Sequence, residues 1–174
     1  MKLRPLLLTA SFLAMFSFAR AEPLKVGDAA PAVTGITETG ATLNFADAYA
    51  KQTYTLVYFY PKADTPGCTK QACSLRDAFA DLSKEGVQVL GVSFDKAEAQ
   101  KAFKDKFTLP YDLIADPEGK IVAAFKVEKM LKGLFSLAKR SCFLVKDGKV
   151  VWQDYAAATE QQAADIKRVL AEVK

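Results

Sequence analysis

The chain has 174 residues, of which 51% are apolar, and it contains no histidine. Its length suits a single domain, since domains average about 150 residues, and its apolar share is sufficient for a buried core. Without histidine the chain cannot build a Ser-His-Asp triad, a histidine-containing zinc site or an imidazole pH switch. With only three cysteines, it cannot form a four-cysteine zinc site within one chain either. Any chemistry must therefore depend on cysteine, carboxylate, lysine, arginine, tyrosine or backbone groups.

The net charge of +4 is concentrated at the N-terminus, because the segment 1–21 carries basic residues and no acidic one. A basic start, an apolar stretch over 6–18 and a small-x-small sequence at 19–21 are typical of a secretory signal. The apolar stretch is shorter than the about 20 residues of a membrane span. An uncleaved anchor and an apolar first helix of the fold are the alternatives. We expect signal cleavage, export to the periplasm, and a nearly neutral domain over 22–174 that binds neither nucleic acid nor membrane.

The remainder of the chain alternates between strand and helix patterns. Strands are predicted where β-branched, aromatic and aliphatic residues form short runs, at 53–60, 87–94, 111–115, 141–145 and 150–154. Helices are predicted where apolar residues recur at helical spacing, at 66–84, 97–107 and 160–173. The last two strands flank an Asp-Gly dipeptide, which is typical of a tight hairpin turn. The segment 127–139 is expected to be a solvated loop. This order predicts an α/β fold with a central mixed sheet flanked by helices.

Cys68 and Cys73 lie shortly after the first of these predicted strands. Thr65 suits the N-cap and Pro66 the first position of the following helix. Cys68 then falls in the first turn, where free backbone N–H groups and the positive end of the helix dipole stabilise a thiolate. It shares an apolar stripe with Leu75, so we expect its sulfur at the bottom of a pocket. A sheltered thiolate is a nucleophile suited to a small electrophile.

A permanent Cys68–Cys73 disulfide is the simplest alternative, because cysteine pairs in exported proteins usually form one. Helical geometry argues against it, since residues five apart stand about 8–9 Å apart at Cα. A disulfide tolerates a Cα separation of only about 7 Å. A permanent bridge would thus exclude the helix that the surrounding pattern predicts, but the residues alone leave both interpretations open.

The segment 58–77 (Tyr-Phe-Tyr-Pro-Lys-Ala-Asp-Thr-Pro-Gly-Cys-Thr-Lys-Gln-Ala-Cys-Ser-Leu-Arg-Asp) resembles the active-site segment of peroxiredoxins of the bacterioferritin comigratory protein, or Q, subfamily. The likeness continues at 90–95, 113–116 and 140–145 and covers nearly all of the chain after the signal. The string Pro-x-x-x-Thr-x-x-Cys is highly specific for peroxiredoxins, and a second cysteine five residues on is specific for this subfamily. The resemblance implies a thioredoxin-like fold and a cysteine that reduces hydrogen peroxide and organic hydroperoxides, without a metal or bound cofactor.

The resemblance also implies a role for each matching residue. Cys68 would be the peroxidatic nucleophile and Cys73 the resolving thiol, so that a Cys68–Cys73 disulfide forms during turnover. Pro61 would shield the thiolate, Thr65 would hydrogen-bond to the peroxide oxygens, and Arg140 would stabilise the thiolate and the transition state. A thioredoxin- or glutaredoxin-like donor would then reduce the disulfide. Members of the subfamily are often monomeric, and we expect a monomer here.

Cys142 stands where the family commonly has threonine. On an apolar strand it is expected to be a small buried hydrophobic residue. A reactive or intermolecular thiol is the alternative, since it is the odd cysteine of an exported protein. Arg76 and Asp77 fit either a pair that orients Arg140 or the helix start, or an exposed ion pair of little energetic weight.

Three other functions remain as alternatives. A thiol-disulfide oxidoreductase on the same fold would require a Cys-x-x-Cys motif, which this chain lacks. A copper carrier with a thioredoxin-like fold would require a closer cysteine pair and a histidine ligand. A non-catalytic binding module would be distinguished from an enzyme by its failure to consume peroxide.

Overall fold

The computed structural model describes residues 22–132 and 135–173, so the predicted signal at 1–21 lies outside the described residues. Among the helices of the described part, none is both long and apolar enough to cross a membrane.

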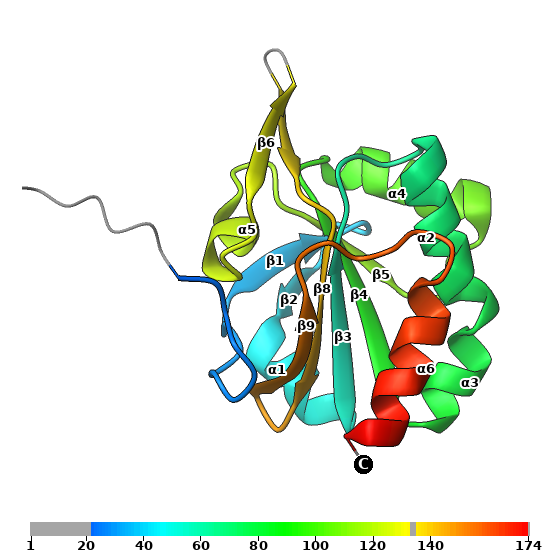
Figure 1. The fold of residues 1–174 in the computed structure, drawn as a ribbon. Coiled ribbons are helices and arrows are strands. Elements are labelled where there is room, and N and C mark those ends of the chain that lie inside the picture. Colours follow the sequence, from blue (N-terminus) through cyan, green and yellow to red (C-terminus); the bar gives the residue numbers. More distant parts are fainter. Residues whose placement is uncertain (1–21, 133–134, 174) are drawn as a thin grey trace, which may run out of the picture.

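The main sheet of the described residues has seven strands in the order β2-β1-β5-β4-β3-β8-β9 (Figure 1). Their bounds are β1 Thr34–Thr37, β2 Thr42–Asn44, β3 Tyr54–Phe59, β4 Val87–Ser93, β5 Asp112–Ala115, β8 Ser141–Lys146 and β9 Lys149–Asp154. Strands β3, β4 and β5 run parallel to one another, and the outer strands pair antiparallel. The mixed direction of the sheet and the β8–β9 hairpin are as predicted.

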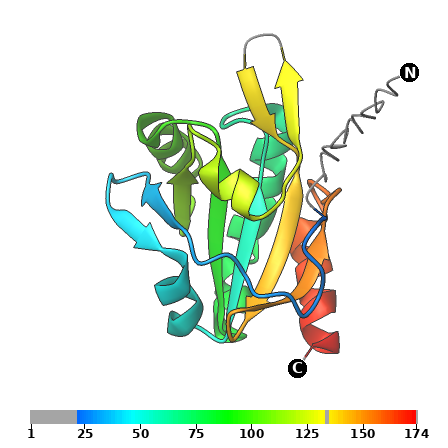
Figure 2. The same ribbon diagram turned by 90° about the vertical axis from the view of Figure 1, so that its left-hand side faces the viewer.

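Helices cover both faces of this sheet (Figures 1 and 2), which is why all six residues of β3 are buried. Leu56 and Tyr58 of β3 enter one core cluster, and Val57 and Phe59 enter the other. The face of Leu56 is covered by α2 Pro66–Asp77, α3 Phe79–Lys84, α4 Ala97–Phe107 and α6 Gln162–Glu172. The opposite face is covered by α1 Phe45–Lys51 and α5 Lys120–Ala124. The predicted arrangement of a helix-flanked sheet is confirmed.

The helix predicted over 66–84 consists of two helices, α2 and α3. The two helices are separated by Ala78, a turn residue with φ −95° and ψ 0° whose N–H still bonds to the Ser74 carbonyl oxygen. Leu75 of α2 and Leu82 of α3 are both fully buried in the same core cluster, so both helices pack on the same face of the sheet. The sequence gives no signal for this break, because alanine is the best helix former.

The segment 127–139 is not the predicted loop but contains a hairpin of β6 Lys129–Lys132 and β7 Phe135–Ala138. The hairpin projects beyond the main sheet in both views (Figures 1 and 2). Residues 129–131 of β6 are all exposed, Leu131 by 81%, so this strand lacks the alternating burial by which a strand is recognised from sequence. The short elements β1, β2, α1 and α5 are likewise not indicated by the sequence pattern.

Candidate active site

The candidate catalytic residues gather at the carboxyl end of β3. Strand β3 runs antiparallel to β8, with Phe59 opposite Ser141, so Arg140 lies beside the point where the chain leaves β3. The chain then passes through the loop 60–65 and enters α2. Strand pairing thereby brings Arg140 to Cys68, from which it is 72 positions distant in the sequence.

The loop 60–65 is attached to the carboxyl end of β4. The Asp95 carboxylate accepts a hydrogen bond from the Ala63 backbone N–H at 2.7 Å and another from Ser93 Oγ at 2.7 Å. Hydrogen bonds to a charged acceptor are about twice as strong as neutral ones. Asp95 therefore fixes the middle of the loop that carries Pro61 and Thr65.

Thr65 occupies the N-cap position of α2, and Pro66 is the first helical residue, as predicted. The Thr65 side chain does not cap the helix, because its hydroxyl donates to the Lys62 carbonyl oxygen at 3.0 Å. With its single proton used in this way, the hydroxyl presents its lone pairs as acceptors. Thr65 and Pro61 are both partly exposed on the loop that precedes α2 in the chain.

Cys68 lies in the first turn of α2 and is only 1% exposed. The first backbone N–H groups of a helix have no partner within the helix, and the helix dipole favours negative charge there. The guanidinium of Arg140 adds a formal positive charge, since its Nη2 stands 3.5 Å from the Cys68 sulfur. Two independent sources of positive potential therefore act on one buried sulfur.

Polar partners hold the Arg140 guanidinium in this position. Its Nη1 donates to Gln71 Oε1, and Gln71 Nε2 donates to Gln162 Oε1 at 2.9 Å. Both glutamines are fully buried. Gly67 leaves room for the guanidinium, because a Cβ at that position would stand 3.3 Å from Arg140 Nη2. The sulfur, the guanidinium and the start of α2 thus form one packed unit.

Cys73 lies further along α2, is half-buried and is unbridged. Both cysteines belong to one helix, so their Cα atoms stand about 8–9 Å apart, beyond the range of a disulfide. Arg76, one turn beyond Cys73, pairs with Asp77 at 2.8 Å and donates to the Phe107 carbonyl at 3.0 Å. Of the two roles weighed for Arg76 and Asp77, the structure supports the partly exposed ion pair.

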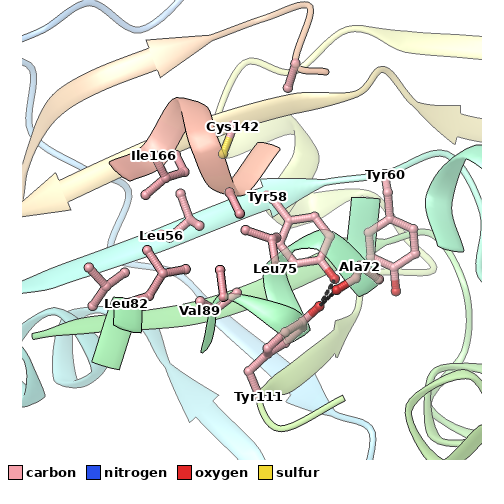
Figure 3. Packing of buried hydrophobic residues seen from close by; sticks show 14 of the residues in the cluster. Leu56, Tyr58, Tyr60, Ala72, Leu75, Leu82, Val89, Tyr111, Cys142 and Ile166 are labelled. Carbon is pink, nitrogen blue, oxygen red and sulfur yellow. Dashed lines mark hydrogen bonds between the residues drawn. The ribbon is translucent and has the colours of Figure 1, made fainter. Parts of the chain in front are cut away.

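Tyr111 contacts the part of α2 between the two cysteines (Figure 3). Its hydroxyl donates to the Ala72 carbonyl oxygen at 2.8 Å and accepts a hydrogen bond from the Tyr58 hydroxyl at 3.4 Å. Burial raises the pKa of Tyr58 and of Tyr111, so both phenols keep their protons and remain donors. The pair ties the middle of α2 to the sheet.

Cys142 lies in β8 opposite Tyr58 and is fully buried, as expected for a small hydrophobic residue (Figure 3). Burial raises the pKa of the Cys142 thiol well above its ordinary value, and the charge of Asp154 raises it further. The thiol therefore stays protonated under neutral conditions.

Four residues around the site are not indicated by the sequence analysis: Gln71, Gln162, Asp95 and Tyr111. A signal existed for Gln71, because it is a polar residue three positions after Cys68 and four before Leu75, next to the core-facing stripe. The others act across long sequence separations, such as the 91 positions between the two glutamines. Such pairings depend on the fold and leave no local pattern.

Sequence comparisons place the chain among known proteins. It matches the AhpC/TSA family over residues 26–153. Peroxiredoxin Bcp of Escherichia coli K12 is 42% identical over 139 residues, which cover 76% of this chain and 88% of that protein. Peroxiredoxin bcp1 of Schizosaccharomyces pombe is 42% identical over 106 residues, which cover 61% of this chain and only 54% of that longer protein.

Solved structures share the fold. Peroxidoxin BcpB from Mycobacterium tuberculosis superimposes with a TM-score of 0.80 at 27% identity, covering 87% of this chain and 99% of that one. Peroxiredoxin Q from Xanthomonas campestris gives a TM-score of 0.74 at 25% identity, covering 87% and 98% of the two chains. These matches confirm the thioredoxin-like fold that the resemblance implied. The chain therefore belongs to the AhpC/TSA family, within its Bcp and Q group of peroxiredoxins.

Proposed function

We propose that this protein is a thiol-dependent peroxidase that reduces hydrogen peroxide and organic hydroperoxides, with Cys68 as the nucleophile. The observation that carries the proposal is a buried sulfur at the start of α2 with a guanidinium nitrogen 3.5 Å away. The names of the relatives support the same reaction class.

In the first step the Cys68 thiolate attacks the terminal oxygen of the hydroperoxide. An S–O bond forms and the O–O bond breaks, which leaves sulfenic acid on Cys68. The leaving oxygen takes the electron pair and a proton, and departs as water or alcohol. Arg140 and the first-turn amides of α2 are positioned to stabilise the charge that passes from sulfur to the oxygens, which is usually the largest contribution to rate.

Thr65 and Pro61 would orient the peroxide and exclude water. The Thr65 hydroxyl donates to Lys62, so it is free to accept a hydrogen bond from the O–H of the substrate. Pro61 lies on the same loop and has no backbone N–H to hydrate. Because Asp95 fixes this loop through Ala63, both residues are held ready before the substrate arrives.

Cys73 would resolve the sulfenic acid in the second step. Its thiol displaces the hydroxyl from the Cys68 sulfur, which yields a Cys68–Cys73 disulfide and one molecule of water. On the intact helix the two Cα atoms are too far apart for this bond. The turn between the cysteines must therefore unwind before the disulfide can form.

Unwinding has a definite cost in this structure. It would break the hydrogen bond from Tyr111 to the Ala72 carbonyl and release Gln71 from Arg140. It would also loosen the packing of Ala72, which is fully buried. Local openings of helix ends require a few kcal/mol or less, so the step is accessible when a covalent bond captures the open form.

Turnover is completed by an external dithiol donor of the thioredoxin or glutaredoxin kind. The donor attacks the Cys68–Cys73 disulfide, becomes a disulfide itself and returns both cysteines to thiols. We propose that the protein works as a monomer in the periplasm, after cleavage of the signal that ends at Ala21.

Peroxide consumption by the purified chain, with thioredoxin or glutaredoxin as donor, tests the proposed activity. We expect turnover with hydrogen peroxide and with an alkyl hydroperoxide. A reduced, folded protein that consumes neither peroxide with any dithiol donor would contradict the proposal.

Replacing Cys73 with serine tests the resolving role separately. We expect Cys68 of the variant to form sulfenic acid with one molecule of peroxide and sulfinic acid with a second, because the resolving thiol is missing. Mass spectrometry of the oxidised protein would detect the added oxygens, and the wild type should instead lose two hydrogens. Undiminished turnover of Cys73→Ser without small thiols would assign resolution to another group.

Export is tested by N-terminal sequencing of protein recovered from the periplasm. We expect a mature chain that begins at Glu22. A protein that keeps Met1 and stays in the cytosolic fraction would remove the export proposal without affecting the proposed chemistry.

A further inference from the structure

Gln162 is a buried polar residue whose partner lies inside the candidate active site. It is the first residue of α6 and is fully buried. The match to the AhpC/TSA family ends at residue 153, so Gln162 lies outside the matched segment. Its Oε1 accepts a hydrogen bond from Gln71 Nε2 at 2.9 Å.

The donor and acceptor chemistry of the three side chains fixes their order. A guanidinium can only donate, so the atom of Gln71 that faces Arg140 must be the amide oxygen. The Gln71 amide nitrogen then points the other way and requires an acceptor, which Gln162 Oε1 provides. If Gln162 offered no acceptor, the buried Gln71 nitrogen would lose its partner. Rotation of the Gln71 amide away from Arg140, toward another acceptor, would then become favourable.

Gln162 itself uses only its oxygen within the described residues. Its Nε2 is buried and has no hydrogen-bond partner there. A buried amide that leaves its donor unused is costly and uncommon. The cost of a glutamine at this position is explained if its Oε1 atom is needed as an acceptor, because Oε1 is the atom that bonds to Gln71.

We propose that Gln162 is a positioning residue that acts through Gln71 to hold the Arg140 guanidinium against the Cys68 sulfur. The inference rests on the peroxidase function proposed above. It extends that site to α6, so that the C-terminal helix contributes to the peroxide-reducing step as well as to the core.

A second hydrogen bond between the same two helices provides a matched control. The Ala163 backbone N–H donates to Ser74 Oγ at 3.2 Å, and neither group contacts Arg140. Ser74→Ala removes one contact between α2 and α6, as a Gln162 substitution does, but leaves the Gln71–Arg140 pair intact. Comparing the two variants distinguishes a loss of Arg140 positioning from a general weakening of the contact between α2 and α6.

The test uses Gln162→Met, which keeps the volume of the side chain and removes the acceptor. The measured quantity is the second-order rate constant of the reduced full chain with hydrogen peroxide in a single turnover. We expect this constant to fall by about three- to tenfold in Gln162→Met, the scale of one lost buried hydrogen bond. Ser74→Ala should stay within about twofold of the wild type, as expected of a change outside the network. Equal rate constants for Gln162→Met and the wild type would overturn the inference, as would equal losses in Gln162→Met and Ser74→Ala.

A double-mutant cycle tests whether Gln162 acts through Gln71. If it does, the double variant Gln71→Met with Gln162→Met should be no slower than Gln71→Met alone. Additive losses would show independent effects and contradict the positioning role. Should Gln162→Met fail to fold, Gln162→Asn provides the same test, since its shortened amide stays polar and withdraws from Gln71. A wild-type chain that does not react with peroxide would refute the proposed function, whereas a reactive wild type with an equally reactive, folded Gln162 variant would refute this inference alone.

Discussion

Cys68 and Cys142 belong to the same core cluster and are almost equally buried, at 1% and 0% exposure, yet their surroundings differ. Cys68 lies at the start of a helix with the Arg140 guanidinium against its sulfur. Cys142 lies within a strand opposite Tyr58, and the charge that acts on it most strongly is that of an acidic residue, Asp154. A positively charged group therefore contacts one sulfur, whereas burial and an acidic group act on the other.

Burial alone therefore does not determine whether a thiol in this protein is reactive or inert. Burial removes water from both sulfurs and so strengthens every remaining electrostatic interaction. At Cys68 the remaining interactions come from donors and positive potential, whereas at Cys142 burial acts against the charged form and its pKa rises.

Removing each sulfur in turn should separate the two sites completely. We expect Cys68→Ser to abolish peroxide consumption, because a serine hydroxyl is not ionised at neutral pH and cannot replace the thiolate. Cys142→Val, which preserves an apolar side chain in the strand, should retain activity within about twofold, as expected of a conservative core change. Steady-state peroxide consumption with a dithiol donor measures both. A dead Cys142→Val variant that is correctly folded would reverse the assignment of roles.

Removing the guanidinium should make Cys68 resemble Cys142. We expect Arg140→Met to lower the second-order rate constant with hydrogen peroxide by about 10²–10³, the usual cost of losing one donor to a developing charge. Arg76→Met is the matched control, because Arg76 is bonded to Asp77 and Phe107 rather than to Cys68. Stopped-flow measurement of the reduced proteins would compare them. Similar losses in the two variants would show a general charge effect instead of a directed contact.

Cys142 should also leave a signature in the pH dependence of stability. Because its pKa is raised in the folded state, folding favours the protonated thiol, and stability is lost as the pH rises above the unfolded thiol value of about 8.5. We expect the free energy of unfolding to fall between pH 7.5 and 9.5 by about 1 kcal/mol more in the wild type than in Cys142→Val. Urea unfolding of the reduced proteins at both pH values measures the difference. Parallel curves for the two proteins would mean that Cys142 titrates normally.

The smallest expected effect concerns the phenol that holds the middle of α2. Tyr111→Phe removes the hydrogen bond to the Ala72 carbonyl, which contributes about 1 kcal/mol or less. We expect amide exchange in residues 68–76 to rise by up to about fivefold while the rate of the peroxide step changes little. Tyr54→Phe is the control, since the Tyr54 hydroxyl bonds to Val173 at the other end of β3. Faster exchange in both variants would indicate loss of general stability.

Much of this site could be predicted from the sequence, because its determinants are local. Thr65 and Pro66 mark the start of α2, and the apolar spacing from Cys68 to Leu75 predicts which face turns inward. The burial of Cys142 follows from the apolar strand around it. The bounds of α4 agree with the prediction because its apolar residues recur regularly and face one core.

Features that depend on the assembled fold could not be predicted in this way. The break at Ala78 is one such feature, because alanine by itself favours a continuous helix. Residues 129–131 of β6 are all exposed, so this strand has no pattern of alternating burial. The bonds that join Arg140, Gln71 and Gln162 come from three separate segments, and only the strand order and helix docking bring them together.

The division of the predicted long helix at Ala78 limits how far the proposed opening of α2 can spread. The regular helix α2 already ends there and α3 begins at Phe79, so unwinding that begins near Cys68 meets a boundary between two helices. Leu82 would stay buried and the amount of apolar surface exposed by disulfide formation would be small. Because the denaturant dependence of unfolding scales with the surface that unfolding exposes, the thiol and disulfide forms should have nearly the same m-value. The two redox forms would then differ in the position of their unfolding midpoints and hardly at all in the steepness of their transitions.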